Sequence, residues 1–500
     1  MDQETKNDRL YAYIVLGVAV AAAIIGIATG HGDLVLDILK GAGLMMLAIT
    51  ILVTIHELGH FWAAKAFGMR VETFSIGFPP VIWKTKRGET EYQIGMIPLG
   101  GYVKISGIID ESLDESNMQS EAQPWEFRAK PIWQRLIVMV GGVTMNVILG
   151  VLVFAAMKFF FGETRTPVSA LKHKIEVTDI VRSKDKDGKE HCRTTLGYYL
   201  GLRSGDSLIS FSGQKFKYVE EYQNPQLLMD GGYYEVKRGD KIEKVNIPLG
   251  AMNLMSADTI APVLFDLNYP SKIEVVEDKP MRPAQKAGLK TGDMVVKMDS
   301  TPVQHFKQLK KMLDESKANQ NIVFTVLREG KELQIPVQTD ADKKIGVAPV
   351  FEDTAITYNL GQSLAKGSSE AFGFVSANAK GFGKMASGEV KASKSVMGPL
   401  GIAKKYLEIF TKGGWKGFLF LTGMLSMILA FMNILPIPAL DGGHVVFLLV
   451  EAIMRREPPL KVRMVIQQIG MVLLLLLMVA IIGNDFITHL FGGGPQDICK

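Results

Sequence analysis

Two histidines and a glutamate lie within one apolar stretch, "LVTIHELGHFWAAKAFG", from Leu52 to Gly68. His56 and His60 are four residues apart, so on an α-helix both imidazoles project from the same face. Two neutral imidazoles at this spacing can supply two ligands of a tetrahedral zinc ion. Glu57 is then placed to act as a general base on a metal-bound water. The pattern predicts a catalytic metal centre.

The alternative is a chance match to this pattern. Chance matches usually fall on solvated helices, whereas here Glu57 would face hydrocarbon. An unmatched carboxylate at membrane depth costs about 2.5–3.5 kcal/mol. A bound metal and an internal water cavity would remove this cost, so we favour the metal site.

A third ligand is expected from "FMNILPIPALDGGH", 431–444, because catalytic zinc usually has three protein ligands and one water. Pro436 and Pro438 must break the helix there, and irregular backbone at membrane depth is tolerated where it lines a cavity. Asp441 offers a carboxylate oxygen and is the best candidate. Two alternatives stay open: Asp441 could only cap the following helix, and His444 could be a fourth ligand, although a supporting or packing role suits His444 better.

Long apolar blocks must position these residues. The mean hydropathy is +0.16, and five blocks are about long enough to cross a bilayer: 11–29, 41–62, 136–157, 418–440 and 464–482. The first block could instead be a cleaved signal peptide, but its apolar core is too long and its flank too weakly basic. We therefore expect a polytopic α-helical membrane protein with five spans.

Basic residues near the predicted spans indicate the orientation. Residues 63–135 and 454–463 are rich in Lys and Arg, whereas 30–40 and the tail after 483 each hold one Lys. The basic segments are therefore expected in the cytoplasm, and 162–413 outside it. This topology accounts for most of the net charge of +5, so we expect no nucleic-acid partner.

The predicted outer insert contains an internal repeat. "LGLRSGDSLISFSGQKF" at 200–216 matches "AGLKTGDMVVKMDSTPV" at 287–303. A helix-like segment and a hairpin pattern follow the second copy, and this order resembles tandem PDZ domains. PDZ domains bind extended peptides by adding a strand to a sheet edge. The alternative is a pair of β modules that only occlude the membrane site.

Together, "HELGH", "NILPIPALDGG" and the PDZ-like modules between them resemble the site-2 protease family of intramembrane metalloproteases, over about residues 41–483. The resemblance implies one Zn²⁺ per chain and Glu57 as the catalytic base. The implied zinc ligands are His56, His60 and Asp441. The residues implied to shape the substrate cleft are Asn433, Pro436 and Pro438.

The family also places a membrane-reentrant β element between the first two core spans, here at 71–107. Its edge is expected to pair with an unwinding substrate through Gly95, Gly100, Gly101 and Tyr102. The sequence departs from the family pattern at Pro79, where a glycine is usual. The span at 11–29 is a second departure.

The resemblance divides the chain into six parts. They are an N-terminal extension with an extra span (1–40), the first part of the catalytic core (41–161), two PDZ-like domains (162–265 and 266–350), a juxtamembrane helical connector (351–413) and the second part of the core (414–500).

The implied activity is hydrolysis of peptide bonds within transmembrane segments of single-pass membrane proteins, in the bacterial inner membrane. Implied substrates are a trimmed anti-sigma factor and remnant signal peptides, with the PDZ pair gating access. Two alternatives remain: a proteolytically inactive PDZ-bearing chaperone or scaffold, and a metal transporter. A transporter would need polar residues through several spans, whereas those in this sequence cluster at one depth.

Overall fold

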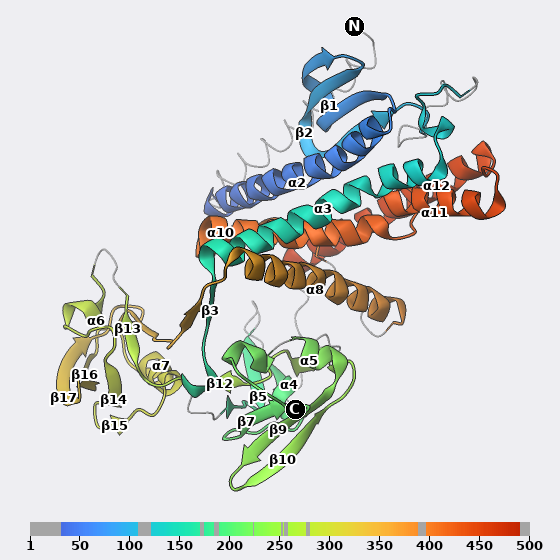
Figure 1. Cartoon of the computed structure of the whole chain (residues 1–500). Coiled ribbons are helices and arrows are strands. Elements are labelled where there is room, and N and C mark those ends of the chain that lie inside the picture. Colours follow the sequence, from blue (N-terminus) through green and yellow to red (C-terminus); the bar gives the residue numbers. More distant parts are fainter. Residues whose placement is uncertain are drawn as a thin grey trace. The chain divides into compact units, whose positions relative to one another are not determined.

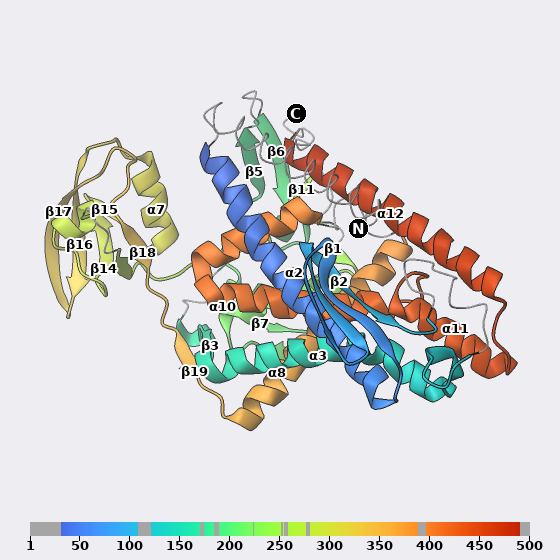
Figure 2. The same cartoon turned by 90° about the horizontal axis from the view of Figure 1, so that it is seen from above.

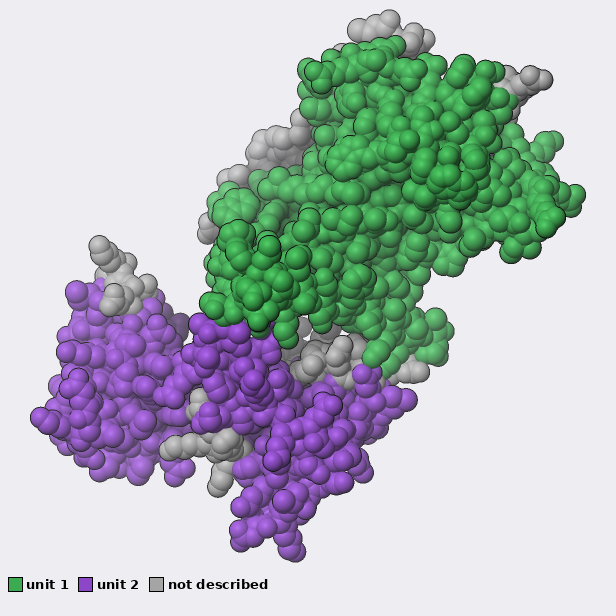
Figure 3. Space-filling view, viewed as in Figure 1, with its two compact units in different colours: residues 1–162, 357–493 green, residues 163–356, 494–500 purple. Residues whose placement is uncertain are grey.

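The computed structural model describes residues 32–108, 122–170, 175–184, 190–223, 225–251, 254, 259–276, 281–388 and 397–490. The chain forms two compact units (Figure 3). Unit 1 comprises 1–162 and 357–493, and unit 2 comprises 163–356 and 494–500. Unit 1 contains the long helices, and unit 2 is built mainly of short strands (Figure 1).

Unit 1 is a helical assembly suited to a membrane. Its helices are α2 (Gly32–Ala66), α3 (Ile132–Phe161), α8 (Leu360–Ala386), α10 (Pro399–Ile434), α11 (Asp441–Met454) and α12 (Leu460–Leu490). Among the described residues, four helical segments are long and apolar enough to cross a membrane: Leu36–Ala66, Ile132–Phe161, Pro399–Ile434 and Leu460–Asn484. They coincide with four of the five predicted spans, which supports a polytopic membrane protein. The fifth, at 11–29, lies outside the described residues.

Helix α3 is central to unit 1. It packs against α2, α8, α10 and α11, and β1 and β2 lie against α2 (Figures 1 and 2). Small residues permit the closest contact, as is common between membrane helices. A Cβ added at Gly141 of α3 would lie 2.7 Å from the carbonyl oxygen of Gly59 in α2. This contact brings the backbone of α3 against the turn of α2 that carries the two histidines.

The predicted span at 418–440 is helical only as far as Ile434, and its last six residues form an irregular segment. Helix α10 begins at Pro399, is interrupted only at Gly414 (φ 55°, ψ −142°) and ends at Ile434. The segment 435–440 is irregular and contains the two prolines, after which α11 begins at Asp441. Proline removes a backbone donor and clashes with a preceding helical turn, so the break follows from the sequence.

Strands β1 (Val71–Arg87) and β2 (Thr90–Ile105) form one bent antiparallel hairpin. Both strands fold back, so that Thr73 pairs with Lys104 on one side and with Glu91 on the other. The outer segments of the resulting element are 81–87 and 97–105. Among the described residues, no other strand pairs with the free side of 97–105, which leaves it as a sheet edge.

Unit 2 contains two β modules, each with its own hydrophobic core. The strands of the first are β4 (Ile175–Glu176), β5 (Ile180–Lys184), β6 (Glu190–Thr195), β7 (Ser207–Phe211), β8 (Gln214–Lys215), β9 (Gly232–Arg238), β10 (Lys241–Ile247), β11 (Ile260–Ala261) and β12 (Asp266–Leu267). Those of the second are β13 (Ile273–Val275), β14 (Met294–Met298), β15 (Thr301–Pro302), β16 (Asn321–Arg328), β17 (Lys331–Gln338) and β18 (Val347–Pro349). β3 (Glu163–Arg165) pairs with β19 (Thr354–Ile356). The short helices are α4 (Leu196–Tyr199), α5 (Pro225–Asp230), α6 (Pro283–Lys286) and α7 (Phe306–Glu315).

The internal repeat predicted from the sequence corresponds to a repeated sheet. The first module has the order β8-β7-β9-β10, and the second has the equivalent order β15-β14-β16-β17. The Gly-Asp pair of each copy has a common role. Asp206 accepts hydrogen bonds from Arg238 (2.8 Å), and Asp293 accepts them from Arg328 (2.7 Å). Each buried carboxylate thus ties the start of one central strand to the end of its neighbour.

Candidate metal centre and catalytic cavity

Three predicted ligands meet in unit 1. His56 and His60 come from α2, Asp441 is the first residue of α11, and one ligand atom of each lies within 4.8 Å of the others. The two histidine Nε2 atoms are 3.1 Å apart. Asp441 Oδ2 is 3.1 Å from Nε2 of His56 and 3.4 Å from Nε2 of His60.

These separations fit a tetrahedral zinc ion. With bonds of roughly 2.0–2.1 Å, the ligand atoms of such an ion lie about 3.3 Å apart. Asp441 Oδ2 is buried and makes no hydrogen bond to any described residue, so a cation would satisfy it. Helix α11 has Leu440 as its N-cap residue and no side-chain cap, so the carboxylate of Asp441 is not used as a helix cap. The donor set therefore fits a divalent metal with a preference for nitrogen and oxygen ligands.

Helix α3 orients the second imidazole. His60 Nδ1 lies 2.8 Å from the carbonyl oxygen of Val138. A carbonyl can only accept, so Nδ1 carries the proton and Nε2 presents its lone pair to the other two ligand atoms. Gly142 lies one turn further along α3. A Cβ there would lie 2.6 Å from His56 Nε2, and closer still to His60 Nε2.

A cavity of about 650 Å³ opens beside the three ligands. Glu57 lines it next to the two histidines, and Gly101 of β2 lies opposite, where an added Cβ would be 3.7 Å from Glu57 Cγ. Residues 100–105 of the free sheet edge also line the cavity. The edge strand and the candidate base therefore share one space.

The residues predicted to contact substrate fall into two groups. Those that line the cavity are Gly100, Gly101, Tyr102 and Asn433, and the amide nitrogen of Asn433 lies 3.4 Å from His56 Nε2. Those that do not are Gly95, Pro436 and Pro438. Gly95 is pressed against the backbone of Phe78 inside the bent hairpin, and Pro438 packs against Gly470 of α12.

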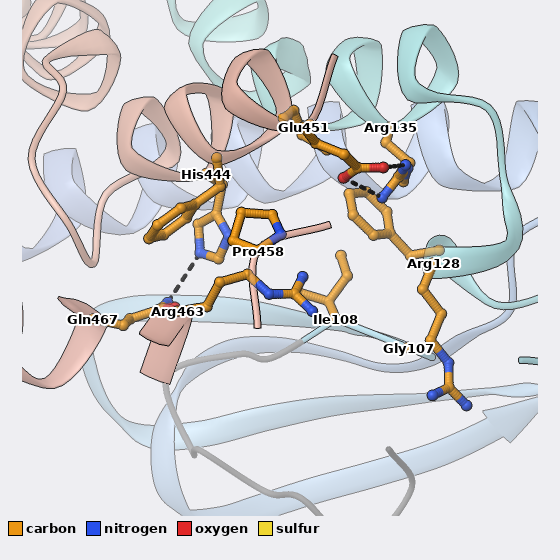
Figure 4. A pocket seen from close by; sticks show the side chains of 12 residues that line it. Gly107, Ile108, Arg128, Arg135, His444, Glu451, Pro458, Arg463 and Gln467 are labelled. Atoms are coloured by element: carbon orange, nitrogen blue, oxygen red, sulfur yellow. Dashed lines mark hydrogen bonds and ion pairs between the residues drawn. The ribbon is translucent and has the colours of Figure 1, made fainter. Parts of the chain in front are cut away.

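His444, the alternative fourth ligand, is not among the three residues that converge. Its Nε2 accepts a hydrogen bond from Gln467 Nε2 at 3.0 Å (Figure 4). Figure 4 also shows Arg135 of α3 paired with Glu451 of α11. These groups line a small cavity of about 40 Å³. The ion pair ties the far end of the helix that begins with Asp441 to α3.

Sequence reasoning missed two groups near the ligands. Asn146 of α3 is 1% exposed, and its amide lies 3.2 Å from His56 Nδ1. Gln467 of α12 is also buried. The available signal was the amide side chains within two apolar blocks: Asn146 in 136–157, and Gln467 next to Gln468 in 464–482.

Comparisons with known proteins indicate the class of protein. The family model described as peptidase family M50 matches residues 44–477. A protein named regulator of sigma E protease from Haemophilus influenzae is 30% identical over 90% of this chain and 100% of its own length. A putative zinc metalloprotease from Vibrio cholerae is 27% identical over 90% of this chain and 99% of its own length. The regulator of sigma-E protease RseP of Escherichia coli is 27% identical, over 88% and 97% respectively. The chain therefore belongs to peptidase family M50 and is a membrane metalloprotease.

Proposed function

We propose that the protein is an intramembrane zinc endopeptidase that cleaves peptide bonds within the transmembrane segments of single-pass membrane proteins. The observation that carries this proposal is the shared cavity: three metal-ligating atoms, Glu57 and a free strand edge line one space between helices apolar enough to span a bilayer. A protease that acted only on soluble peptides would not need two of its three ligands, His56 and His60, on such a helix.

Each residue at the centre has a role in this reaction. His56, His60 and Asp441 would hold one zinc ion, which when bound polarises the scissile carbonyl and activates a water. Glu57 accepts the proton of that water and passes it to the departing amine. Asn433 donates a hydrogen bond from its amide to the carbonyl oxygen as negative charge develops there.

The strand edge 97–105 can help to unwind the substrate. A helical substrate keeps its carbonyls in its own hydrogen bonds, so the helix must unwind before hydrolysis. Residues 100–105 of this edge line the cavity, and the free side of the edge can pair with the exposed backbone groups of the unwound segment. Gly100, Gly101 and Tyr102 would lie alongside the substrate. Gly95, Pro436 and Pro438 are not lining residues and would act indirectly, Gly95 through the bend of the hairpin and the two prolines through the helix break before Asp441.

The substrate class and its control follow by analogy with the relatives named for regulation of sigma E. We propose an anti-sigma factor already trimmed outside the membrane, or remnant signal peptides, as substrates in a bacterial inner membrane. The two modules of unit 2 would be PDZ-like domains on the extracytoplasmic side that limit access to trimmed proteins. Their equivalent sheets and separate cores support two folded modules of one kind.

The test is cleavage of a purified single-span substrate by the protein in a lipid nanodisc, with the products mapped by mass spectrometry. The proposal predicts a cut inside the hydrophobic segment that stops on zinc chelation and returns on addition of zinc. Cuts confined to the flanking polar segments would contradict it. Binding without any cleavage would instead support the scaffold alternative.

A further inference from the structure

Asn146 is a buried group in contact with a predicted ligand that the proposed mechanism does not use. It lies on α3, is 1% exposed and also lines the cavity. Its amide nitrogen lies 3.2 Å from Nδ1 of His56, and its Oδ1 has no hydrogen-bond partner among the described residues. A buried amide oxygen without a partner is costly and calls for an explanation.

The two ends of an amide side chain are nearly the same in shape, and their assignment follows from the hydrogen-bond network. With nitrogen toward His56, the imidazole must accept at Nδ1 and hold its proton on Nε2, the atom that faces Asp441 and His60. With the amide turned by 180°, Oδ1 accepts the proton of Nδ1. Nε2 is then free to bind a metal, and the unsatisfied oxygen gains its partner.

We propose that Asn146 is a positioning residue that holds His56 in the zinc-binding tautomer and ring orientation. This inference rests on the proposed zinc site. The arrangement matches that of His60, whose Nδ1 donates to the Val138 carbonyl oxygen two turns earlier on the same helix. Helix α3 thus supplies the outer hydrogen-bond partner of both imidazoles. Such partners fix the ring and raise its basicity as a ligand.

The test compares zinc affinity across variants of the full-length protein by competition with a chelator. Asn146→Leu removes the acceptor. Asn146→Ser keeps a hydroxyl oxygen but withdraws it from His56, because the serine side chain is shorter, whereas Asn146→Asp keeps an acceptor oxygen at the original position. We expect the first two to weaken zinc binding roughly 10–100-fold, and the aspartate variant to stay within a few-fold of the wild type. Thr144→Val and Ser426→Ala are the controls. The first alters an exposed hydroxyl on α3, and the second removes the donor to the backbone oxygen of Asn146.

Two outcomes would overturn the inference. One is wild-type zinc affinity in both Asn146→Leu and Asn146→Ser. The other is an affinity of Asn146→Asp as low as theirs, which would indicate a role in packing alone. Helix content and thermal unfolding of the zinc-free variants identify any that fail to fold, and the serine variant is the smaller disturbance. Absence of zinc from the wild type would instead overturn the proposed metal site, and this inference with it.

Discussion

Asp441 Oδ2 lies 3.1 Å from His56 Nε2, although Asp441 opens α11 near the end of the chain and His56 belongs to α2 near its start. The segment 435–440 makes this meeting possible, because α10 must stop there for α11 to begin at the candidate metal centre. Arg135 then holds the other end of α11 through Glu451. The geometry of the candidate centre therefore depends on α2, α3 and α11 and on the irregular segment 435–440.

Replacing Asp441 tests that relationship. We expect Asp441→Asn to lose zinc and proteolysis together, because an amide oxygen is a weaker ligand than a carboxylate. The loss of zinc affinity should exceed the roughly 10–100-fold cost of changing an outer partner. Zinc content of the purified protein measures the effect. Asp240→Asn, in an exposed turn of unit 2, is the matched control. Full zinc occupancy in Asp441→Asn would rule out this residue as a ligand.

Gly142 tests the close approach of α3. Gly142→Ala places a methyl group 2.6 Å from His56 Nε2, so the imidazoles must move. A displacement of about 1 Å at a reacting centre can cost on the order of 100-fold in kcat/KM. We expect a loss of this size, together with weaker zinc binding. Gly43→Ala in α2, where an added Cβ meets nothing within 4 Å, should leave both unchanged. Equal kcat/KM and equal zinc binding in Gly142→Ala and Gly43→Ala would show that α3 does not constrain the positions of the two histidines.

The free sheet edge predicts a pattern of crosslinks. A photoreactive residue in place of Tyr102 should crosslink to every second residue of the bound substrate segment. This is expected because the side chains of a substrate bound as a β-strand point alternately to opposite faces. Mass spectrometry of the adduct locates these positions. The same residue in place of Trp83, on the outer segment away from the cavity, should give no such pattern. A period of three to four residues at position 102 would mean that the substrate stays helical.

The ion pair in the second module predicts a dependence on pH. Burial raises the pKa of the Asp293 carboxyl, but hydrogen bonds from Arg328 and the Lys290 amide outweigh it and leave the pKa below the ordinary 3.8. A lowered folded-state pKa contributes stability above pH 3.8, and this stability is lost as the pH falls through the folded value. Asp293→Asn should remove this dependence and destabilise the module by about 1.5–3 kcal/mol at neutral pH.

Hydrogen exchange of the backbone amides in β14 and β16, measured in the full chain, gives the free energy of opening of the second module and so tests this destabilisation. Asp314→Asn, at an exposed position of α7, is the control. Unchanged protection of both strands in Asp293→Asn would refute the stabilising role. The equivalent Asp206→Asn should loosen β7 and β9 of the first module while leaving the second as it was.

The sequence predicted the candidate metal ligands better than it predicted the residues that pack around them. The approach of Asp441 to His56 and His60 was predictable, because these residue types and this spacing suit a metal and because charge in an apolar span is costly. Asn146 and Gly142 were not recognised, since their roles depend on α3 packing against α2, and local patterns do not encode such packing. The form of the β element at 71–107 was not predicted either: it is two long strands, bent so that each pairs with two segments. A single amide in an apolar helix remains a usable signal for future sequences of this kind.

The most direct measurement is cleavage of a single-span substrate by the wild type and by Glu57→Gln, with zinc content measured on both. We expect Glu57→Gln to keep its zinc and to lose cleavage, because the proposed metal ligands are intact and only the base is gone. Cleavage by Glu57→Gln at the wild-type rate, with zinc bound, would contradict the assignment of Glu57 as the base at this centre.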